Sequence, residues 1–269
     1  MDYRGVRIVL RREDLVNPEL PGNKWRKLKY NLRAAREQGA TTLLTFGGAY
    51  SNHIRATAAA GRIYGFGTVG IIRGEAHHPL NESLAKAVAD GMQLGYLDRE
   101  SYRAKTNPAV LAQLRHRFGD FYLLPEGGSN ALAVRGCREI VEEIDVDFDV
   151  ICCPVGTGGT LAGIAAALPD GKRAIGFSAL RGGAEFLPAQ VRRLQGTDVT
   201  DNWSITDDYA MGGFARRTPE LDSFIERFRD EHGIELEWVY VAKMMYGIHA
   251  LADNGTFPAG STVIAVITG

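Results

Sequence analysis

The most constraining feature of this sequence is the alternation of short apolar runs with segments of helical periodicity along its whole length. Seven runs are short, rich in branched residues and bounded by glycine, proline or charge, as buried strands are. They cover residues 6–10, 42–46, 68–72, 121–124, 150–155, 174–178 and 262–268. Helical patterns lie between them, at residues 27–38, 52–64, 81–94, 108–117, 131–144, 160–168, 219–232 and 244–254. Strands that alternate with helices predict an α/β fold whose sheets are mainly parallel.

Length and composition place the chain among ordinary globular proteins. Its 269 residues suffice for one large or two modest domains, and 45% hydrophobic with 23% charged residues is typical of a folded protein. No long linker separates two halves, so two domains would have to be intertwined. Thirty-one basic and 32 acidic residues give a net charge of -1, which supplies no general field for nucleic acid or an anionic membrane surface.

Cysteine usage and hydropathy indicate a cytoplasmic protein. The three cysteines, two of them adjacent at Cys152 and Cys153, form neither a disulfide framework nor a metal-ligand spacing, which fits a reducing compartment. The amino terminus lacks the pattern of a secretory signal, and no apolar stretch is long enough to cross a membrane. We therefore expect a cytoplasmic protein without a transmembrane segment and without a metal site.

Glycine is over-represented, with 32 residues or about 12% against a background near 7%, and the excess gathers in Gly-Gly pairs. Three pairs open predicted strand-to-helix turns, and each precedes residues that can cap a helix. Such turns either bind carboxylates and phosphates at the helix N-terminus or serve simply as well-capped connections. They are Gly47-Gly48 before Ser51 and Asn52, Gly127-Gly128 before Ser129 and Asn130, and Gly158-Gly159 before Thr160.

The third of these turns has the composition of a phosphate site. Its glycines expose backbone donors and its two threonines add hydroxyl groups. It lacks the Gly-Lys-Ser/Thr ending of a P-loop and the GxGxxG spacing of a dinucleotide-binding turn. A phosphate monoester is therefore a better candidate ligand than a nucleotide. The turn reads Gly156-Thr157-Gly158-Gly159-Thr160.

A lysine-rich segment, GNKWRKLKY, runs into the first predicted helix. We expect Lys24 in the turn before that helix and Lys27 three residues later on the same side, so that both could address one anion. A basic run at a helix start is commonly a solvated face. The alternative is an imine between a lysine amine and a carbonyl cofactor whose phosphate the glycine loop holds. Pyridoxal phosphate combines such an aldehyde with a phosphate monoester.

Five motifs occur in order along nearly the whole chain: GNKWRKLKY, FGGAYSNHIRATAAAG, PEGGSNALAVRG, PVGTGGTLAG and VYVAKMMYGI. Together they resemble the D-cysteine desulfhydrase and 1-aminocyclopropane-1-carboxylate (ACC) deaminase family of pyridoxal phosphate enzymes, which is tryptophan-synthase-β-like, or fold type II. The resemblance implies a two-domain α/β enzyme with mainly parallel sheets, helices on both faces and a homodimeric assembly. Residues 1–34 plus 131–269 would form a larger cofactor domain, and residues 35–130 a smaller inserted α/β domain.

Transferred position by position, the resemblance implies roles for individual residues. Lys24 would hold pyridoxal phosphate as an imine, and Lys27 would contact its phosphate. Asn52 would lie against the cofactor ring, and Ser51 would act as a nucleophile or bind the substrate carboxylate. Tyr240 would lie near the substrate as an acid, a base or an orienting group. Thr268 would face the pyridine nitrogen. The phosphate loop would consist of Gly156, Thr157, Gly158, Gly159 and Thr160.

Two positions favour a desulfhydrase over an ACC deaminase. ACC deaminases of this family carry an acidic residue where this chain has Val241, and they lack the threonine found here as Thr268. A carboxylate near the pyridine nitrogen would keep that nitrogen protonated, whereas a hydroxyl group does so weakly. The chain also departs from many desulfhydrase-like members, which have a threonine where it has Val241 and a tyrosine where it has Phe214. Each of these two positions therefore lacks a hydroxyl group that the resemblance leads us to expect.

The leading hypothesis is a pyridoxal phosphate lyase that acts on a small amino acid. D-cysteine would undergo α,β-elimination and yield pyruvate, ammonia and sulfide. One alternative is an ACC deaminase. Another, from a different class, is a protein that binds pyridoxal phosphate or an anion without turnover.

Overall fold

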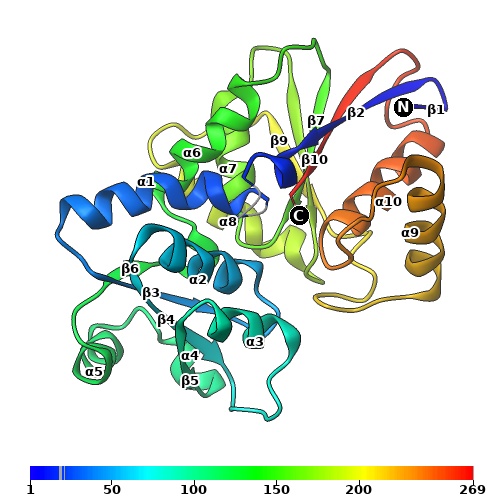
Figure 1. Cartoon of the computed structure of the whole chain (residues 1–269). Coiled ribbons are helices and arrows are strands. Elements are labelled where there is room, and N and C mark those ends of the chain that lie inside the picture. The colour runs from blue at the N-terminus through cyan, green and yellow to red at the C-terminus, as the bar shows by residue number, and fades with distance from the viewer. Residues whose placement is uncertain (18–19, 21, 269) are drawn as a thin grey trace. The chain divides into compact units, whose positions relative to one another are not determined.

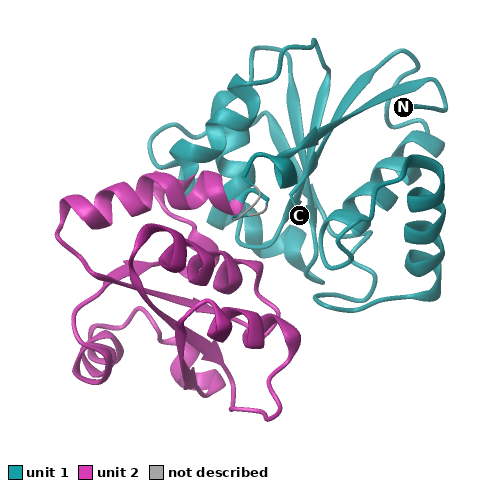
Figure 2. Ribbon diagram, viewed as in Figure 1, with its two compact units in different colours: residues 1–23, 134–269 teal, residues 24–133 magenta. Residues whose placement is uncertain are grey.

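The computed structural model describes residues 1–17, 20 and 22–268, and it divides into two compact units (Figure 2). Unit 1 consists of residues 1–23 and 134–269, and unit 2 of residues 24–133. The sequence analysis drew its domain boundaries elsewhere, at 34/35 and 130/131. The assignment of the larger part as a cofactor domain stays a prediction.

Unit 1 is built on a six-stranded sheet in the order β1-β2-β10-β7-β8-β9 (Figure 1). Strand β1 is antiparallel to β2, and the other neighbours pair in parallel. The carboxyl-terminal strand β10 lies in the middle, between β2 and β7. The strands are β1 (Asp2–Tyr3), β2 (Val6–Arg12), β7 (Val150–Val155), β8 (Arg173–Ser178), β9 (Trp203–Thr206) and β10 (Thr262–Ile267).

Helices cover both faces of this sheet because its central strands are apolar on both sides. In β7, Val150 and Cys152 cluster with α9 and α10, whereas Ile151, Cys153 and Val155 cluster with α6, α7 and α8. Burial on both sides explains why β7 is an unbroken apolar run rather than an alternating one. The helices are α6 (Ala131–Glu142, in unit 1 from residue 134), α7 (Gly159–Ala167), α8 (Gly183–Gln195), α9 (Pro219–His232) and α10 (Val241–Asp253), with a 3₁₀ turn η1 (Glu13–Leu15) after β2.

Unit 2 contains a four-stranded parallel sheet in the order β5-β4-β3-β6. Phe46 clusters with Tyr102 and Leu114 on one face, and Ile72 clusters with Ile54 and Leu84 on the other. Both units therefore confirm the predicted α/β fold with mainly parallel sheets. The elements are α1 (Lys24–Glu37), β3 (Thr42–Gly47), α2 (Asn52–Tyr64), β4 (Gly67–Arg73), α3 (Glu82–Ala89), β5 (Met92–Leu97), α4 (Arg99–Arg103), α5 (Pro108–Phe118), β6 (Tyr122–Leu124) and η2 (Glu126–Gly128).

Each predicted strand matches an observed one, but two predictions about helices are wrong. Residues 92–94, predicted at the end of a helix, begin β5, because α3 ends at Ala89 and Gly91, with a φ of +90°, turns the chain into the strand. Lys24 lies in the first turn of α1 rather than before it. The sequence analysis did not predict β1, β5, β9, α4 or α8.

The three cysteines, Cys137, Cys152 and Cys153, are buried and are not joined in disulfide bonds. They pack as small apolar side chains in the core of unit 1. In the described part of the chain, no helix combines the length and the apolar character that a membrane crossing needs. Among the same residues, no cluster of three or more metal-ligating side chains occurs.

Close packing of α6 on α7 depends on Gly163. A Cβ at this position would lie 2.4 Å from the Cβ of Cys137 and 2.7 Å from the backbone oxygen of Val134. Helix propensity alone favours alanine over glycine by about 1 kcal/mol, but the contact with backbone atoms outweighs it. We expect Gly163→Ala to lower the free energy of unfolding in urea by about 1–3 kcal/mol, and Gly163→Ser to lower it further. An unchanged or higher value for the alanine variant would contradict this packing.

Candidate functional site

The register of the unit 1 sheet brings two sequence-predicted site elements together. Strands β10 and β7 run in parallel with Ala265 opposite Cys152. Thr268, which follows β10, is therefore level with Val155, where β7 gives way to the glycine loop 156–160. Thr268 is buried. The topology thus places Thr268 beside the start of the predicted phosphate loop.

The glycine loop leads into α7 with a glycine at the capping position. Gly158, with a φ of +83°, is the N-cap and provides no side-chain hydrogen bond. Helix α2, in contrast, is capped by the hydroxyl group of Ser51. The N-cap residue of α7 thus offers no side-chain acceptor to the first N–H groups of the helix, an arrangement that suits a bound anion.

Asn23 is a residue of this region that the sequence analysis missed. Its side-chain Nδ2 donates a 2.6 Å hydrogen bond to Oγ1 of Thr160 in the first turn of α7, and both residues are buried. Asn23 belongs to the motif GNKW, in which only the lysines suggested chemistry. The sequence signal that could have pointed to Asn23 is its position directly before Lys24.

Tyr240 is held in place by three contacts within unit 1. The Glu237 carboxylate accepts hydrogen bonds from the backbone N–H groups of Val239 at 2.7 Å and of Tyr240 at 2.8 Å, at the start of α10. The tyrosine ring fits against Gly156, because a Cβ there would lie 3.1 Å from the phenolic oxygen. Phe214 meets the same ring edge-on, with the ring centroids 5.9 Å apart. Tyr240 therefore lies beside the glycine loop in a defined orientation.

Lys24 and Lys27 open helix α1 in unit 2. Lys27 is buried, and its Nζ donates to the Gly127 carbonyl at 3.2 Å and to the Ser129 hydroxyl group at 3.3 Å. These bonds connect the start of α1 to the second glycine turn, whereas Lys24 is only half-buried. The imine at Lys24 and the phosphate contact of Lys27 stay predictions.

Ser51 and Asn52 lie at the N-terminus of α2. The Ser51 hydroxyl group caps the helix by accepting a 3.4 Å hydrogen bond from the backbone N–H of Ile54, and Asn52 is the first helical residue. Gly47 lets the turn close, because a Cβ there would lie 2.6 Å from the Ile54 side chain and 2.8 Å from Ser51 Oγ. Both predicted site residues therefore lie at the partially positive end of a helix, where a carboxylate is stabilised.

His53, the next residue, is a fully buried imidazole whose tautomer follows from its partners. The Thr45 hydroxyl group donates its one proton to the Leu124 carbonyl at 3.0 Å, so it accepts a hydrogen bond from Nε2 of His53 at 2.9 Å. Nδ1 is then unprotonated, and it has no partner in the described part of the chain. Burial, with the charges of Lys24 and Lys27, holds the pKa of His53 well below its usual 6.5.

The structure thus gathers the predicted site residues in two groups. In unit 1 the carboxyl edge of the sheet holds the glycine loop 156–160, Thr268 and Tyr240. In unit 2, α1, α2 and η2 contact one another. Lys27 bonds to the glycine turn whose Gly128 lies against the ring of His53, so the turn connects the start of α1 with the residue that follows Asn52. Their roles toward a cofactor or substrate stay predictions.

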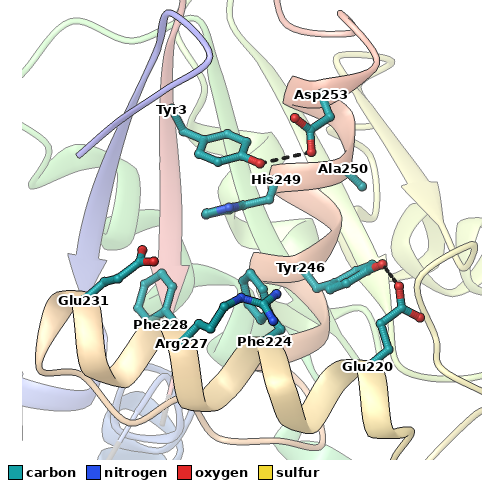
Figure 3. A pocket seen from close by; sticks show the side chains of 10 residues that line it. All are labelled: Tyr3, Glu220, Phe224, Arg227, Phe228, Glu231, Tyr246, His249, Ala250 and Asp253. Atoms are coloured by element: carbon teal, nitrogen blue, oxygen red, sulfur yellow. Dashed lines mark hydrogen bonds between the residues drawn. The ribbon is translucent and has the colours of Figure 1, made fainter.

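A cavity of about 320 Å³ lies elsewhere in unit 1, among β1, α9 and α10 (Figure 3). Two pairs of its polar side chains are hydrogen-bonded. The Tyr3 hydroxyl group donates to Asp253 at 3.0 Å, and the Tyr246 hydroxyl group donates to Glu220. None of the predicted site residues lines it. These pairs connect β1 and α9 to α10, and we do not assign the cavity to the candidate site.

Comparison with known proteins bears on the whole chain. The family described as pyridoxal-phosphate dependent enzyme matches residues 2–269. A Thermotoga maritima protein to which ACC deaminase activity is provisionally assigned is 33% identical over 267 residues, which cover 93% of this chain and 85% of that protein. The mitochondrial bifunctional D-cysteine desulfhydrase/ACC deaminase of Arabidopsis thaliana is 30% identical over 290 residues, which cover 98% of this chain and 72% of that protein.

One solved structure extends this likeness to the fold. The crystal structure of an ACC deaminase homologue matches with a TM-score of 0.83 at 27% sequence identity. The match covers 97% of this chain and 84% of that one.

The neutral state of His53 predicts a pH-dependent contribution to stability. Because its pKa is lower in the folded than in the unfolded chain, the unfolded chain binds an extra proton below about pH 6.5. Stability should therefore fall as the pH decreases from 6.5, and His53 contributes at most about 1.4 kcal/mol per pH unit to that fall. Urea unfolding between about pH 7 and pH 5 should show a smaller loss for His53→Gln than for the unsubstituted protein.

The exposed residue His116 provides the control for this measurement. His116→Gln should lose as much stability on acidification as the unsubstituted protein. Equal losses in His53→Gln, His116→Gln and the unsubstituted protein would contradict a buried neutral imidazole at position 53.

Proposed function

Because this chain belongs to the pyridoxal-phosphate dependent enzyme family, we propose that it catalyses α,β-elimination from a small amino acid, as a D-cysteine desulfhydrase does. D-cysteine and water would yield pyruvate, ammonia and hydrogen sulfide. The mainly parallel sheets with helices on both faces are those of the fold type II enzymes of this family.

The donor groups of the chain fit pyridoxal phosphate. The glycine-capped start of α7, with the hydroxyl groups of Thr157 and Thr160 next to it, suits the three oxygens of a phosphate monoester. Lys27 would add a positive charge, and the amine of Lys24 suits the aldehyde. When bound, this cofactor supplies an electron-accepting ring that stabilises negative charge on the substrate α-carbon.

We assign the covalent attachment of the cofactor to Lys24. Its amine would hold the aldehyde of the cofactor, and its Nζ would also be the base for the substrate α-proton. Ser51 and Asn52, with the N-terminus of α2, would bind and orient the substrate carboxylate, and Asn52 would also lie against the cofactor ring. The position of Ser51 as the N-cap of α2 supports this assignment, because the partially positive end of a helix stabilises a carboxylate.

Tyr240 is the second candidate for proton transfer. Glu237, Gly156 and Phe214 fix its backbone and its ring, so its phenolic oxygen has a defined position beside the glycine loop. Such pre-positioning is what a group needs to protonate a leaving thiolate or to orient the substrate.

We favour α,β-elimination over opening of the ACC ring because two residues expected near the cofactor are uncharged. Val241 is fully buried within an apolar cluster, and Thr268 is an uncharged hydroxyl group at the end of β10. Neither residue provides the carboxylate that would keep the cofactor's pyridine nitrogen protonated. A weaker electron sink suffices for a D-cysteine desulfhydrase-like activity, because thiolate is a good leaving group.

ACC deaminase activity is the second candidate function. The names of the Thermotoga maritima and Arabidopsis thaliana relatives favour it. We further propose that the enzyme acts as a homodimer in the cytoplasm, which the family resemblance and the pattern of free cysteines support.

A substrate panel tests the proposed reaction. The holoenzyme is assayed for sulfide and for the oxo acid product with D-cysteine, L-cysteine, β-chloro-D-alanine, D-serine and ACC. We expect kcat/KM for D-cysteine to exceed that for ACC by at least about tenfold. The reverse order would favour the deaminase. A bound cofactor whose spectrum changes with none of these compounds would indicate a binding protein and contradict the proposal.

Substitution of Lys24 tests the site. Lys24→Ala should abolish the visible absorption band of the lysine-bound cofactor and lower kcat by at least about 10³-fold. Lys86→Ala, which removes an exposed lysine, is the matched control and should keep both. A Lys24→Ala protein with an unchanged band and unchanged turnover would assign the attachment to another lysine.

A further inference from the structure

Lys243 is a buried charge that the proposed chemistry does not use. It lies in α10 with only 2% of its surface exposed. Its Nζ donates hydrogen bonds to the Ala210 carbonyl at 2.8 Å and to the Gly213 carbonyl at 2.7 Å. Removing an ammonium group from water is costly, and a methionine of similar length would fill the same space without that cost. What the lysine adds is therefore its two directed bonds.

Burial affects the protonation of this group as well. It lowers the pKa of Lys243 to about 8, while the nearby Glu237 carboxylate acts in the opposite direction. The amine therefore stays mostly protonated at neutral pH. A charged donor makes stronger hydrogen bonds to carbonyl groups than a neutral one.

Both carbonyl groups belong to the segment 207–216, which makes up most of the connection between β9 and α9. Met211 and Ala215 in this segment have φ angles of +50° and +51°, which residues with a Cβ rarely adopt. Backbone in such a conformation persists only where its surroundings hold it. The bonds from Lys243 reach the segment at 210 and 213, within and beside this strained part.

The same segment carries Phe214, whose ring meets the ring of Tyr240 edge-on at 5.9 Å. Tyr240 is the N-cap of α10 and Lys243 lies in its first turn, three residues later. One helix end therefore fixes both the tyrosine and the segment that packs on it.

We propose that Lys243 is a positioning residue that holds the segment 207–216 on α10, keeps Phe214 beside Tyr240 and thereby sets the affinity for the amino-acid substrate. This inference rests on the proposed function only where it takes Tyr240 and Phe214 to face the substrate. The hold on the segment is independent of any activity.

Two variants and a control distinguish the hold on the segment 207–216 from the effect on substrate affinity. Lys243→Met keeps the volume and removes the donors, and Lys243→Arg restores charged donors. Lys86→Met, at an exposed position, controls for the loss of a lysine. The segment ends beside two exposed trypsin sites, Arg216 and Arg217, so the rate of cleavage there reports how firmly it is held.

For Lys243→Met we expect cleavage after Arg216 or Arg217 to be at least about tenfold faster under native conditions. In the holoenzyme, KM for D-cysteine should rise at least about fivefold while the cofactor absorption band is unchanged. Lys243→Arg should recover part of both effects, and Lys86→Met should show neither. Should Lys243→Met fail to fold, Lys243→Gln, which keeps donors but is too short to reach both carbonyls, replaces it with the same expectations.

Two outcomes overturn the inference. Cleavage of Lys243→Met at the unsubstituted rate would show that the lysine does not hold the segment. Faster cleavage with an unchanged KM would show that the segment does not set substrate affinity. If the unsubstituted holoenzyme has no activity toward any amino acid, the proposed function fails, while the cleavage rates still decide the role of Lys243.

Discussion

The insertion of β10 between β2 and β7 is the constraint on which the rest of unit 1 depends. This pairing joins the two ends of the chain in one sheet, so the sheet cannot be completed without the last strand. Because the three strands are parallel, their carboxyl ends meet at one edge. That edge holds Thr268 and the start of the glycine loop. The grouping of these residues is thus a consequence of topology rather than of any local sequence signal.

Several of the clustered glycines are needed for close packing of neighbouring side chains, whether or not they also bind a ligand. Gly47 leaves room for the cap of α2, Gly128 accommodates the buried ring of His53, and Gly156 accommodates the ring of Tyr240. A Cβ at any of these positions would lie within about 3 Å of the neighbouring side chain. Each glycine therefore brings a predicted site residue, or its neighbour, close to a turn. This explains why glycine pairs and candidate site residues occur together in the sequence.

The sequence predicts the elements whose patterns are strongest. Strand β7, an apolar run buried on both faces, is predicted to the residue. The start of strand β5, by contrast, is predicted as part of a helix, because the apolar periodicity of α3 continues into it. In the structure, Gly91, whose φ is positive, turns the chain from α3 into β5. The motifs also indicate the candidate residues on the glycine turns. Lys243 lies within the motif VYVAKMMYGI, but the motif does not indicate its role, because its partners lie about thirty residues earlier in the chain and only the tertiary structure brings them to it.

The attachment of the cofactor to Lys24 is the central claim of this account. Lys243 has the lowered pKa that imine-forming lysines often have. Its Nζ, however, donates hydrogen bonds to two backbone carbonyl groups, so it is a poorer candidate than Lys24. Reduction of the holoenzyme with borohydride, followed by peptide mapping by mass spectrometry, fixes the pyridoxyl group on the lysine that carried it. We predict the label on Lys24. A label on Lys27 or Lys243, with Lys24 unmodified, would contradict the account.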